Sequence, residues 1–157
     1  MPDLLTHVLI GYTIGSLVAT QLTHDRSTVV TLVMLGTILP DLTKIKLIVP
    51  DIYVETLLNI PFSWLALHTL GGVLVTATIG ASLVDATRRK HAFVLLVLGA
   101  VSHLSLDALL IKPSGYSGPL WWPFLKFGLP TPGLFLSSNR WPAVVAGLLA
   151  FLAYWRN

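Results

Sequence analysis

The sequence predicts an all-α integral membrane protein: a bundle of about five transmembrane helices with one short interfacial helix. Of its 157 residues, 54% are hydrophobic and only 11% are charged, whereas a soluble domain carries roughly 25% charged residues. These charges are too few to cover a soluble core of this size. The apolar residues also form runs that approach the ~20 residues needed to cross a bilayer. The length favours a single domain over residues 1–157.

Charge and cysteine content exclude several classes of function. The formal net charge is +3, and its ten basic and seven acidic residues are scattered along the chain. A nucleic-acid-binding surface needs clustered Lys and Arg, so we expect no nucleic-acid partner. The chain contains no Cys, which excludes disulfides and thiolate metal sites. Any metal site must therefore use His, Asp, Glu or backbone oxygen atoms.

The first half of the chain contains two apolar segments and a mixed connection. The first segment, Leu4–Leu22, is not preceded by the basic region of a cleavable signal peptide, so we expect a retained membrane helix. Asp3, directly before it, is interpreted as its N-cap. The second segment, Ser27–Leu39, is short for a span and stops at Pro40-Asp41. Asp51–Ile60 mixes charged and apolar residues between two prolines, which favours a short interfacial helix.

The second half contains three further apolar segments. Phe62–Val84 and Ala92–Ile111 are joined by a polar turn, Asp85–His91. A long loop rich in Pro, Gly and aromatic residues follows over residues 112–141. The last segment begins near Pro142, a residue that suits the first turn of a helix, and it ends at Trp155.

Ionisable side chains inside the predicted spans indicate a functional site. Such side chains are costly in a bilayer, and they usually face the bundle interior. Because successive spans cross in opposite directions, the start of the first, the end of the second, the start of the third and the end of the fourth lie at one membrane face. Five side chains are therefore predicted to meet there, namely His7, Asp41, His68, His103 and Asp107.

The residue types in this group favour a divalent metal site. His103 and Asp107 are four residues apart and share one helix face, so both can reach one ion, or the carboxylate can orient the imidazole. Histidines with carboxylates suit Zn²⁺, with Mn²⁺, Fe²⁺ and Co²⁺ as alternatives. We predict metal ligands at His7, His68, His103 and Asp107, and catalytic carboxylates at Asp41 and Asp107. Taken singly, each side chain could instead hydrogen-bond across helices.

Aromatic and charged residues near the predicted membrane surfaces complete the pattern. Trp121, Trp122 and Phe124 lie in the long loop, where an interfacial aromatic belt is expected, and we predict that they line a substrate entrance. Lys44 and Lys46 are interpreted as interfacial side chains whose charged ends reach the head-group region. His24 and His91 lie in the opposite turns and are interpreted as solvated.

Five short motifs link the chain to a known family. They are Leu5-Thr6-His7, Leu39-Pro40-Asp41, His68-Thr69, His103-Leu104-Ser105-Leu106-Asp107, and Gly118 followed by Trp122-Pro123-Phe124. In these motifs and their order, over about residues 1–125, the chain resembles the small membrane-bound predicted metal-dependent hydrolases that include LexA-regulated inner-membrane members. The resemblance implies a metal-dependent hydrolase without naming its substrate.

Two positions depart from the family pattern. Thr43 stands where the family often has a second Asp, and Ser63-Trp64 stand where it often has a further His and Arg. The missing ligands favour a single-metal or degraded site over a dinuclear one.

Three functions follow from these observations. A hydrolase at the head-group level, acting on a lipid-linked substrate such as a phosphoester, is favoured; its partners are the membrane lipids and that substrate. A non-catalytic scaffold or assembly subunit would use the same residues as a structural His/Asp network. A metal-ion carrier would need polar residues that continue to the opposite face, but the middles of the spans offer only Thr and Ser.

The orientation in the cell membrane is predicted from the basic residues, which divide equally between the two sets of loops. The compact Arg88-Arg89-Lys90 group lies in a short turn, where the positive-inside rule is most reliable. We therefore expect this turn in the cytoplasm and the site at the extracytoplasmic face.

Overall fold

The computed structural model describes residues 4–22 and 25–156, and it is all-α as predicted. The interpretations of Asp3 and His24 lie outside these residues. Within the described ranges the elements, in chain order, are α1 (Leu4–Ala19), α2 (Arg26–Ile38), the 3-10 helix η1 (Leu39–Leu47), α3 (Asp51–Leu58), the 3-10 helix η2 (Trp64–His68), α4 (Leu70–Ser82), α5 (Arg89–Ala108) and α6 (Trp141–Trp155).

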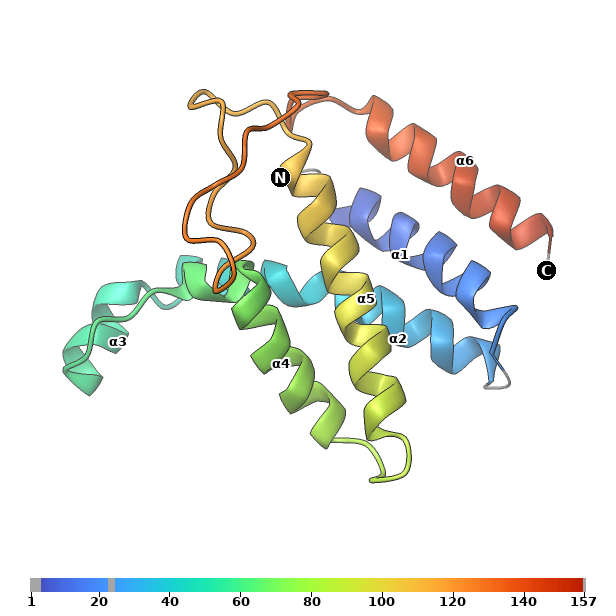
Figure 1. Cartoon of the computed structure of the whole chain (residues 1–157), viewed down its shortest axis with the longest axis horizontal. Coiled ribbons are helices and arrows are strands. Elements are labelled where there is room, and N and C mark those ends of the chain that lie inside the picture. The colour runs from blue at the N-terminus through green and yellow to red at the C-terminus, as the bar shows by residue number, and fades with distance from the viewer. Residues whose placement is uncertain (1–3, 23–24, 157) are drawn as a thin grey trace.

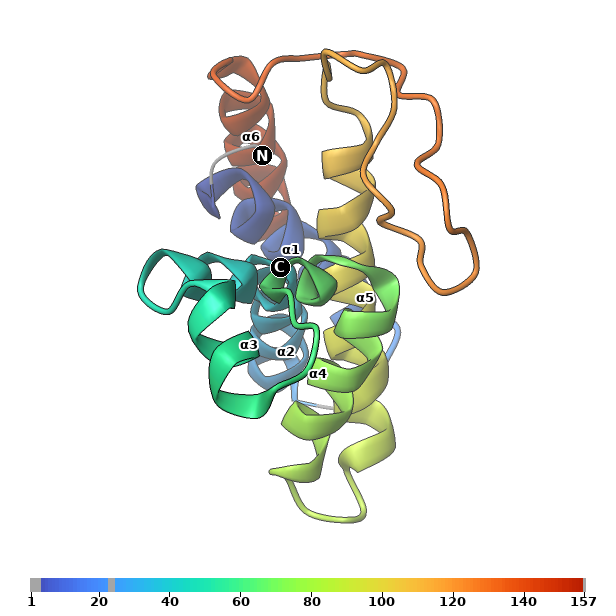
Figure 2. The same cartoon turned by 90° about the vertical axis from the view of Figure 1, so that its left-hand side faces the viewer.

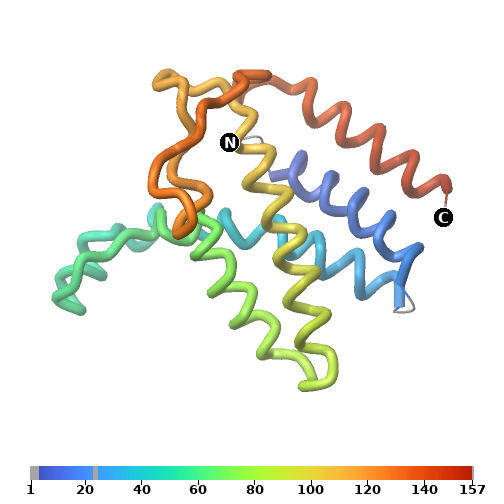
Figure 3. Tube along the Cα trace, viewed as in Figure 1, coloured from blue at the N-terminus to red at the C-terminus, as the bar shows by residue number. Residues whose placement is uncertain are grey.

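Two helical hairpins form the body of the molecule. One pairs α1 with α2, the other pairs α4 with α5, and they pack together through α2 and α5, while α6 lies along α1 (Figure 1). Figure 1 also shows α3 projecting away from this body, and in the turned view of Figure 2 α3 lies in front of α2. In Figure 3 the α4–α5 turn lies at the bottom and the end of α6 lies at the right, whereas α3 lies at the left and the long loop at the upper left. The candidate site lies where the start of α1, η1, the end of η2 and the end of α5 meet.

The distribution of polarity differs from that in a typical soluble protein. Several polar side chains are fully buried, among them His7, Ser16, Thr37 and His103. Many large apolar side chains are exposed on the outer faces of the helices, among them Leu5, Leu17, Val75, Ile79, Val94, Leu148 and Phe151. An extended apolar surface of this kind marks contact with a membrane or a partner, and lipid provides the environment in which it is stable.

Among the described residues, two helical stretches are long and apolar enough to cross a bilayer. They are Arg26–Leu47, which joins α2 to η1 over 22 residues, and Arg89–Ala108, which has 20 residues. The apolar helices α1, α4 and α6 have only 16, 13 and 15 residues. At ~1.5 Å per residue they measure about 20–24 Å, less than the ~30 Å hydrocarbon core of a bilayer. Five complete spans therefore stay a prediction.

The structure differs from the prediction in the second and third spans, although α2 itself ends at Ile38, close to the predicted end. Helical structure does not stop at Leu39 but continues as η1, with Pro40 in its first turn, because a proline at that position needs no hydrogen bond from its nitrogen. The third segment is not one helix, because the chain is extended at Thr69 between η2 and α4. The Thr69 hydroxyl accepts a hydrogen bond from Gly72 N at 3.2 Å and caps α4. His68 consequently ends η2 instead of lying inside a span.

The structure has a short helix, α3, where the interfacial helix is predicted, and α3 has no buried residue. Its position at a membrane interface stays a prediction. Its first residue, Asp51, accepts hydrogen bonds from Trp64 N at 3.1 Å and from the Ser63 hydroxyl at 3.3 Å. The Trp64 indole N–H also donates to Val49 O at 2.7 Å. Ser63 and Trp64, two of the three residues that depart from the family pattern, therefore fasten η2 to α3, next to the segment that carries His68.

Glycines allow the central helices to cross at backbone contact. A Cβ added to Gly99 of α5 would lie 2.0 Å from Val33 O, and one added to Gly36 of α2 would lie 2.2 Å from Leu96 O. Gly15 of α1 meets Val30 of α2 in the same way. Small residues permit such close packing between membrane helices. The crossing of α2 and α5 sets the position of the α2 C-terminal end against His103.

Candidate metal centre

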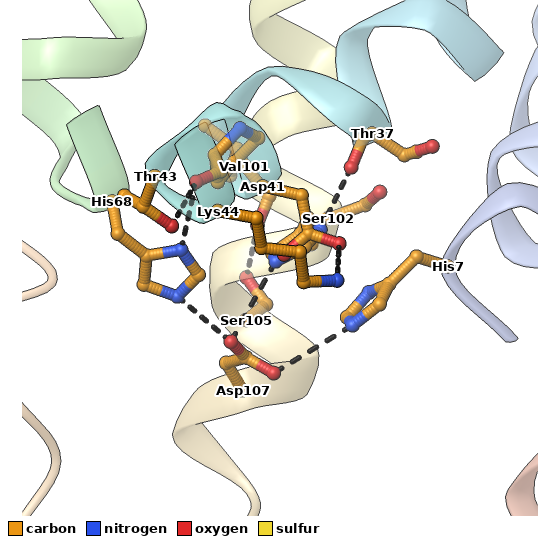
Figure 4. A network of polar contacts seen from close by, with 12 residues as sticks. His7, Thr37, Asp41, Thr43, Lys44, His68, Val101, Ser102, Ser105 and Asp107 are labelled. Atoms are coloured by element: carbon orange, nitrogen blue, oxygen red, sulfur yellow. Dashed lines mark hydrogen bonds and ion pairs between the residues drawn. The ribbon is translucent and has the colours of Figure 1, made fainter. Parts of the chain in front are cut away.

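The structure brings the five predicted side chains together from four regions of the chain. His7 comes from the first turn of α1, Asp41 from η1, and His68 from the end of η2 (Figure 4), while His103 and Asp107 are four residues apart near the end of α5. All five residues are buried. Groups of three of them, His7–His103–Asp107 and Asp41–His68–His103, offer ligand atoms within 4.8 Å of one another.

The Asp107 carboxylate lies at the centre of the cluster. Its Oδ2 is 2.8 Å from His68 Nε2 and 3.6 Å from His103 Nε2, and its Oδ1 is 3.6 Å from His7 Nε2. The His7 and His103 rings stack with their centroids 3.7 Å apart. Three imidazoles therefore converge on one carboxylate through the same ring nitrogen.

Backbone carbonyls determine which nitrogen of two of these rings is free. A carbonyl only accepts, so His103 Nδ1–H donates to Thr37 O at 2.7 Å, and His68 Nδ1–H donates to Pro40 O at 3.1 Å. In the neutral imidazole the other nitrogen, Nε2, then carries a lone pair. Both Nε2 atoms face Asp107, which is also an acceptor. Metal-binding histidines are usually held by such a hydrogen bond from the other ring nitrogen.

Several buried polar atoms of the cluster have no hydrogen-bond partner. They are His7 Nδ1, His7 Nε2, His103 Nε2, Asp41 Oδ1 and Asp107 Oδ1. A buried unsatisfied polar group costs about 1–3 kcal/mol, and more when it is charged. A shared cation would satisfy acceptors of several of these residues at once. The residues present therefore fit a divalent metal ion.

The two groups of potential ligands exclude each other, because both need His103. Its Nδ1 is bonded to Thr37 O, so Nε2 alone is available for a metal. One nitrogen lone pair ligates one ion. We therefore predict one divalent ion per chain, as the missing acid at Thr43 already indicates. Thr43 is buried, and its hydroxyl donates to Pro40 O at 3.3 Å instead of supplying a ligand to the cluster.

The cluster approaches the surface along η1. Asp41 and His68 are 7% and 8% exposed, whereas His7 and His103 are fully buried. Lys44 Nζ lies 2.7 Å from Asp41 Oδ2, and the Lys44 side chain is 50% exposed. The Asp41–His68 side is thus the accessible side of the centre.

The three predicted entrance residues occupy different environments. Trp121 is half-buried and packs against an apolar cluster that contains Leu104. Trp122 is half-exposed and lies on Gly71, the second residue of α4, whose N–H donates to Trp122 O at 2.7 Å. Phe124 is 75% exposed. The loop thus covers the start of α4, next to His68, and an entrance formed by these residues stays a prediction.

Sequence reasoning missed the groups that hold the site in place. The carbonyls of Thr37 and Pro40 carry no side-chain signal. Lys44 was assigned to the interface, although its spacing of three residues from Asp41 within a helix does indicate a contact.

The comparisons with known proteins agree with the resemblance in the motifs. The model of the YdjM inner membrane protein family matches residues 1–157. No curated protein and no solved structure matches the chain. The chain therefore belongs to the YdjM inner membrane protein family, a family of predicted membrane-bound metal-dependent hydrolases.

Proposed function

We propose that the protein is a membrane-embedded, metal-dependent hydrolase that acts near the lipid head-group level on a lipid-linked phosphoester. The observation that carries this proposal is the convergence of three histidine Nε2 atoms on buried Asp107. The lone pairs at His68 and His103 are directed by backbone carbonyls. A histidine and carboxylate set of this kind suits Zn²⁺ best.

The proposed chemistry divides between the buried and the accessible side of the centre. When bound, a divalent cation supplies a Lewis acid and acidifies water near neutral pH. His7, His103 and Asp107 would hold it on the buried side. Asp41, whose Oδ1 is buried and unpaired, would accept the proton of the attacking water as general base. His68 would orient the reacting group beside it.

A lipid-linked substrate is favoured by the surface around the accessible side. Leu47 and Ile48, at the end of η1, are 78% and 83% exposed. Exposed apolar side chains beside a polar site suit an amphiphile, whose chains remain in the bilayer while its head group enters the centre. Membrane lipids are therefore the proposed partners.

The proposal is tested by release of phosphate from phosphatidic acid in mixed micelles. We expect release by the purified protein, its loss on chelation, and its recovery on addition of Zn²⁺. Asp41→Asn should lower kcat by about 10²–10⁴-fold, the usual contribution of a general base, while metal content is retained. Asp85→Asn, in the exposed α4–α5 turn, is the matched control. Release that resists chelation, or an Asp41→Asn variant as active as wild type, would contradict the proposal.

A second candidate is a structural metal centre without catalysis, favoured by the complete burial of His7 and His103. In that case chelation would lower the unfolding temperature of a protein that hydrolyses no phosphoester. Turnover by the metal-loaded protein distinguishes the hydrolase from this alternative.

We also propose that the site faces the extracytoplasmic side, supported by the Arg88-Arg89-Lys90 turn at the opposite helix ends. A reporter that is active only in the cytoplasm, fused at residue 89, should be active. A reporter active only outside the cytoplasm should be silent at the same position. The reverse result would place the site at the cytoplasmic face.

A further inference from the structure

We infer that Lys44 is a substrate-binding residue that selects lipids with a phosphate head group, and that it does so by leaving Asp41 for the phosphate. The inference rests on the proposed function and deepens it, since it assigns the recognition of the substrate to a named side chain. The ligand chemistry is a phosphate carried by a lipid.

The first step is the position of Lys44 between the buried Asp41 and the protein surface. Its ammonium lies 2.7 Å from Asp41 Oδ2, yet its side chain is 50% exposed while that of Asp41 is 5% exposed. In the view of Figure 4 the Lys44 side chain extends across the space framed by His7, His68 and Asp107. An ion pair of this kind is not an ordinary surface pair, because one partner is buried and belongs to the site. Lys44 therefore covers the centre on its accessible side.

The second step is the charge of the centre. Asp41 and Asp107 contribute two negative charges, Lys44 contributes one positive charge, and the histidines are counted as neutral. Without a metal ion the sum is negative, which repels phosphate. A single divalent ion makes it positive by one unit (−2 + 1 + 2), and the absence of an acid at Thr43 is what lets one ion achieve this. The loaded centre therefore attracts an anionic head group.

The third step is the coupling between recognition and Asp41. Lys44 occupies Asp41 Oδ2, while Asp41 Oδ1 is buried without a partner. A phosphate oxygen that takes the Lys44 ammonium frees the Asp41 carboxylate to serve as the general base beside His68 and His103. A neutral head group does not draw Lys44 away from Asp41. The preference for a phosphate head group over a neutral one therefore follows from displacement of the Lys44–Asp41 ion pair.

Binding of a fluorescent phosphatidic acid, compared with a diacylglycerol of the same chains, tests the inference without any turnover. We expect the zinc-loaded full-length protein to bind phosphatidic acid more tightly. Lys44→Gln should weaken that binding by about 10–100-fold, the range for a charge-assisted hydrogen bond, and leave diacylglycerol binding unchanged. Lys44→Arg should preserve the preference. Lys46→Gln, an exposed lysine in the same 3-10 helix, should behave as wild type.

The contrary outcomes separate the two proposals. A wild-type protein that holds no metal would refute the proposed function. A metal-loaded protein that binds both lipids equally, or a Lys44→Gln variant that keeps the preference, would refute the role of Lys44 alone. If Lys46→Gln weakened phosphatidic acid binding as much as Lys44→Gln does, the loss would come from general surface charge, and the specific role of Lys44 would be refuted. Displacement of the fluorescent lipid by inorganic phosphate alone would assign the site to free phosphate and overturn the assignment to a lipid.

Discussion

Asp107→Asn is expected to empty the metal centre while leaving the fold intact. The carboxylate is the group that all three histidines approach, at 2.8–3.6 Å, and the substitution removes its charge at almost constant volume. The new amide can donate a hydrogen bond to His68 Nε2, so the helices keep their contact. Metal affinity should fall by at least about 100-fold, beyond the 10–100-fold range for residues that only orient ligands. Competition against a chelator of known affinity measures this loss.

The Asp107→Asn experiment has two controls, one for the loss of a negative charge and one for the integrity of the fold. Asp85→Asn removes the same charge from an exposed turn and should bind metal as the wild type does. Helical content should be equal in all three proteins. An Asp107→Asn variant with wild-type metal affinity would show that the ion is held elsewhere.

Gly99→Ala is expected to disrupt the crossing of α2 and α5. The added Cβ would lie 2.0 Å from Val33 O and 2.9 Å from Thr37 N, and a change of rotamer cannot move a Cβ away from backbone atoms. The loss of stability should reach at least about 3 kcal/mol, the upper end of typical overpacking costs. Because the crossing holds Thr37 O against His103, metal binding should weaken as well. Thermal unfolding in detergent measures the first effect.

The matched control for this prediction is Gly147→Ala in α6. A Cβ at Gly147 has no atom within 4 Å, and alanine favours a helix over glycine by about 0.5–1 kcal/mol. This variant should therefore unfold at the wild-type temperature or slightly above it. Equal unfolding temperatures for the two variants would contradict the account of the crossing.

The convergence of the site was predictable from the sequence because it depends only on the order of the spans. Helix alternation brings the start of the first, the end of the second and the end of the fourth to one side whatever their packing. His7, Asp41 and Asp107 needed no further information. The details of this packing were not predictable, because the contact of Gly36 with Leu96 and of Gly99 with Val33 joins positions far apart in the chain.

The breaks in the helices were hidden by their composition. Phe62–Val84 is an almost continuous apolar run, and in it one threonine carries little weight against hydropathy. Thr69 nevertheless ends η2 and caps α4, which lets His68 turn its Nδ1–H toward Pro40 O. The role of the Thr37 carbonyl was hidden too, because its contact with His103 depends on how α2 and α5 cross. The residues of the site were visible in the sequence, but the groups that fix their tautomers were not.

The metal content of the wild-type protein, purified without a histidine tag and measured by inductively coupled plasma mass spectrometry, tests the central claim most directly. A single centre built on His103 and Asp107 predicts about one divalent ion per chain, with zinc favoured by the histidine-rich ligand set. Folded protein that contains no divalent ion, even after incubation with zinc and removal of the excess, would contradict the account.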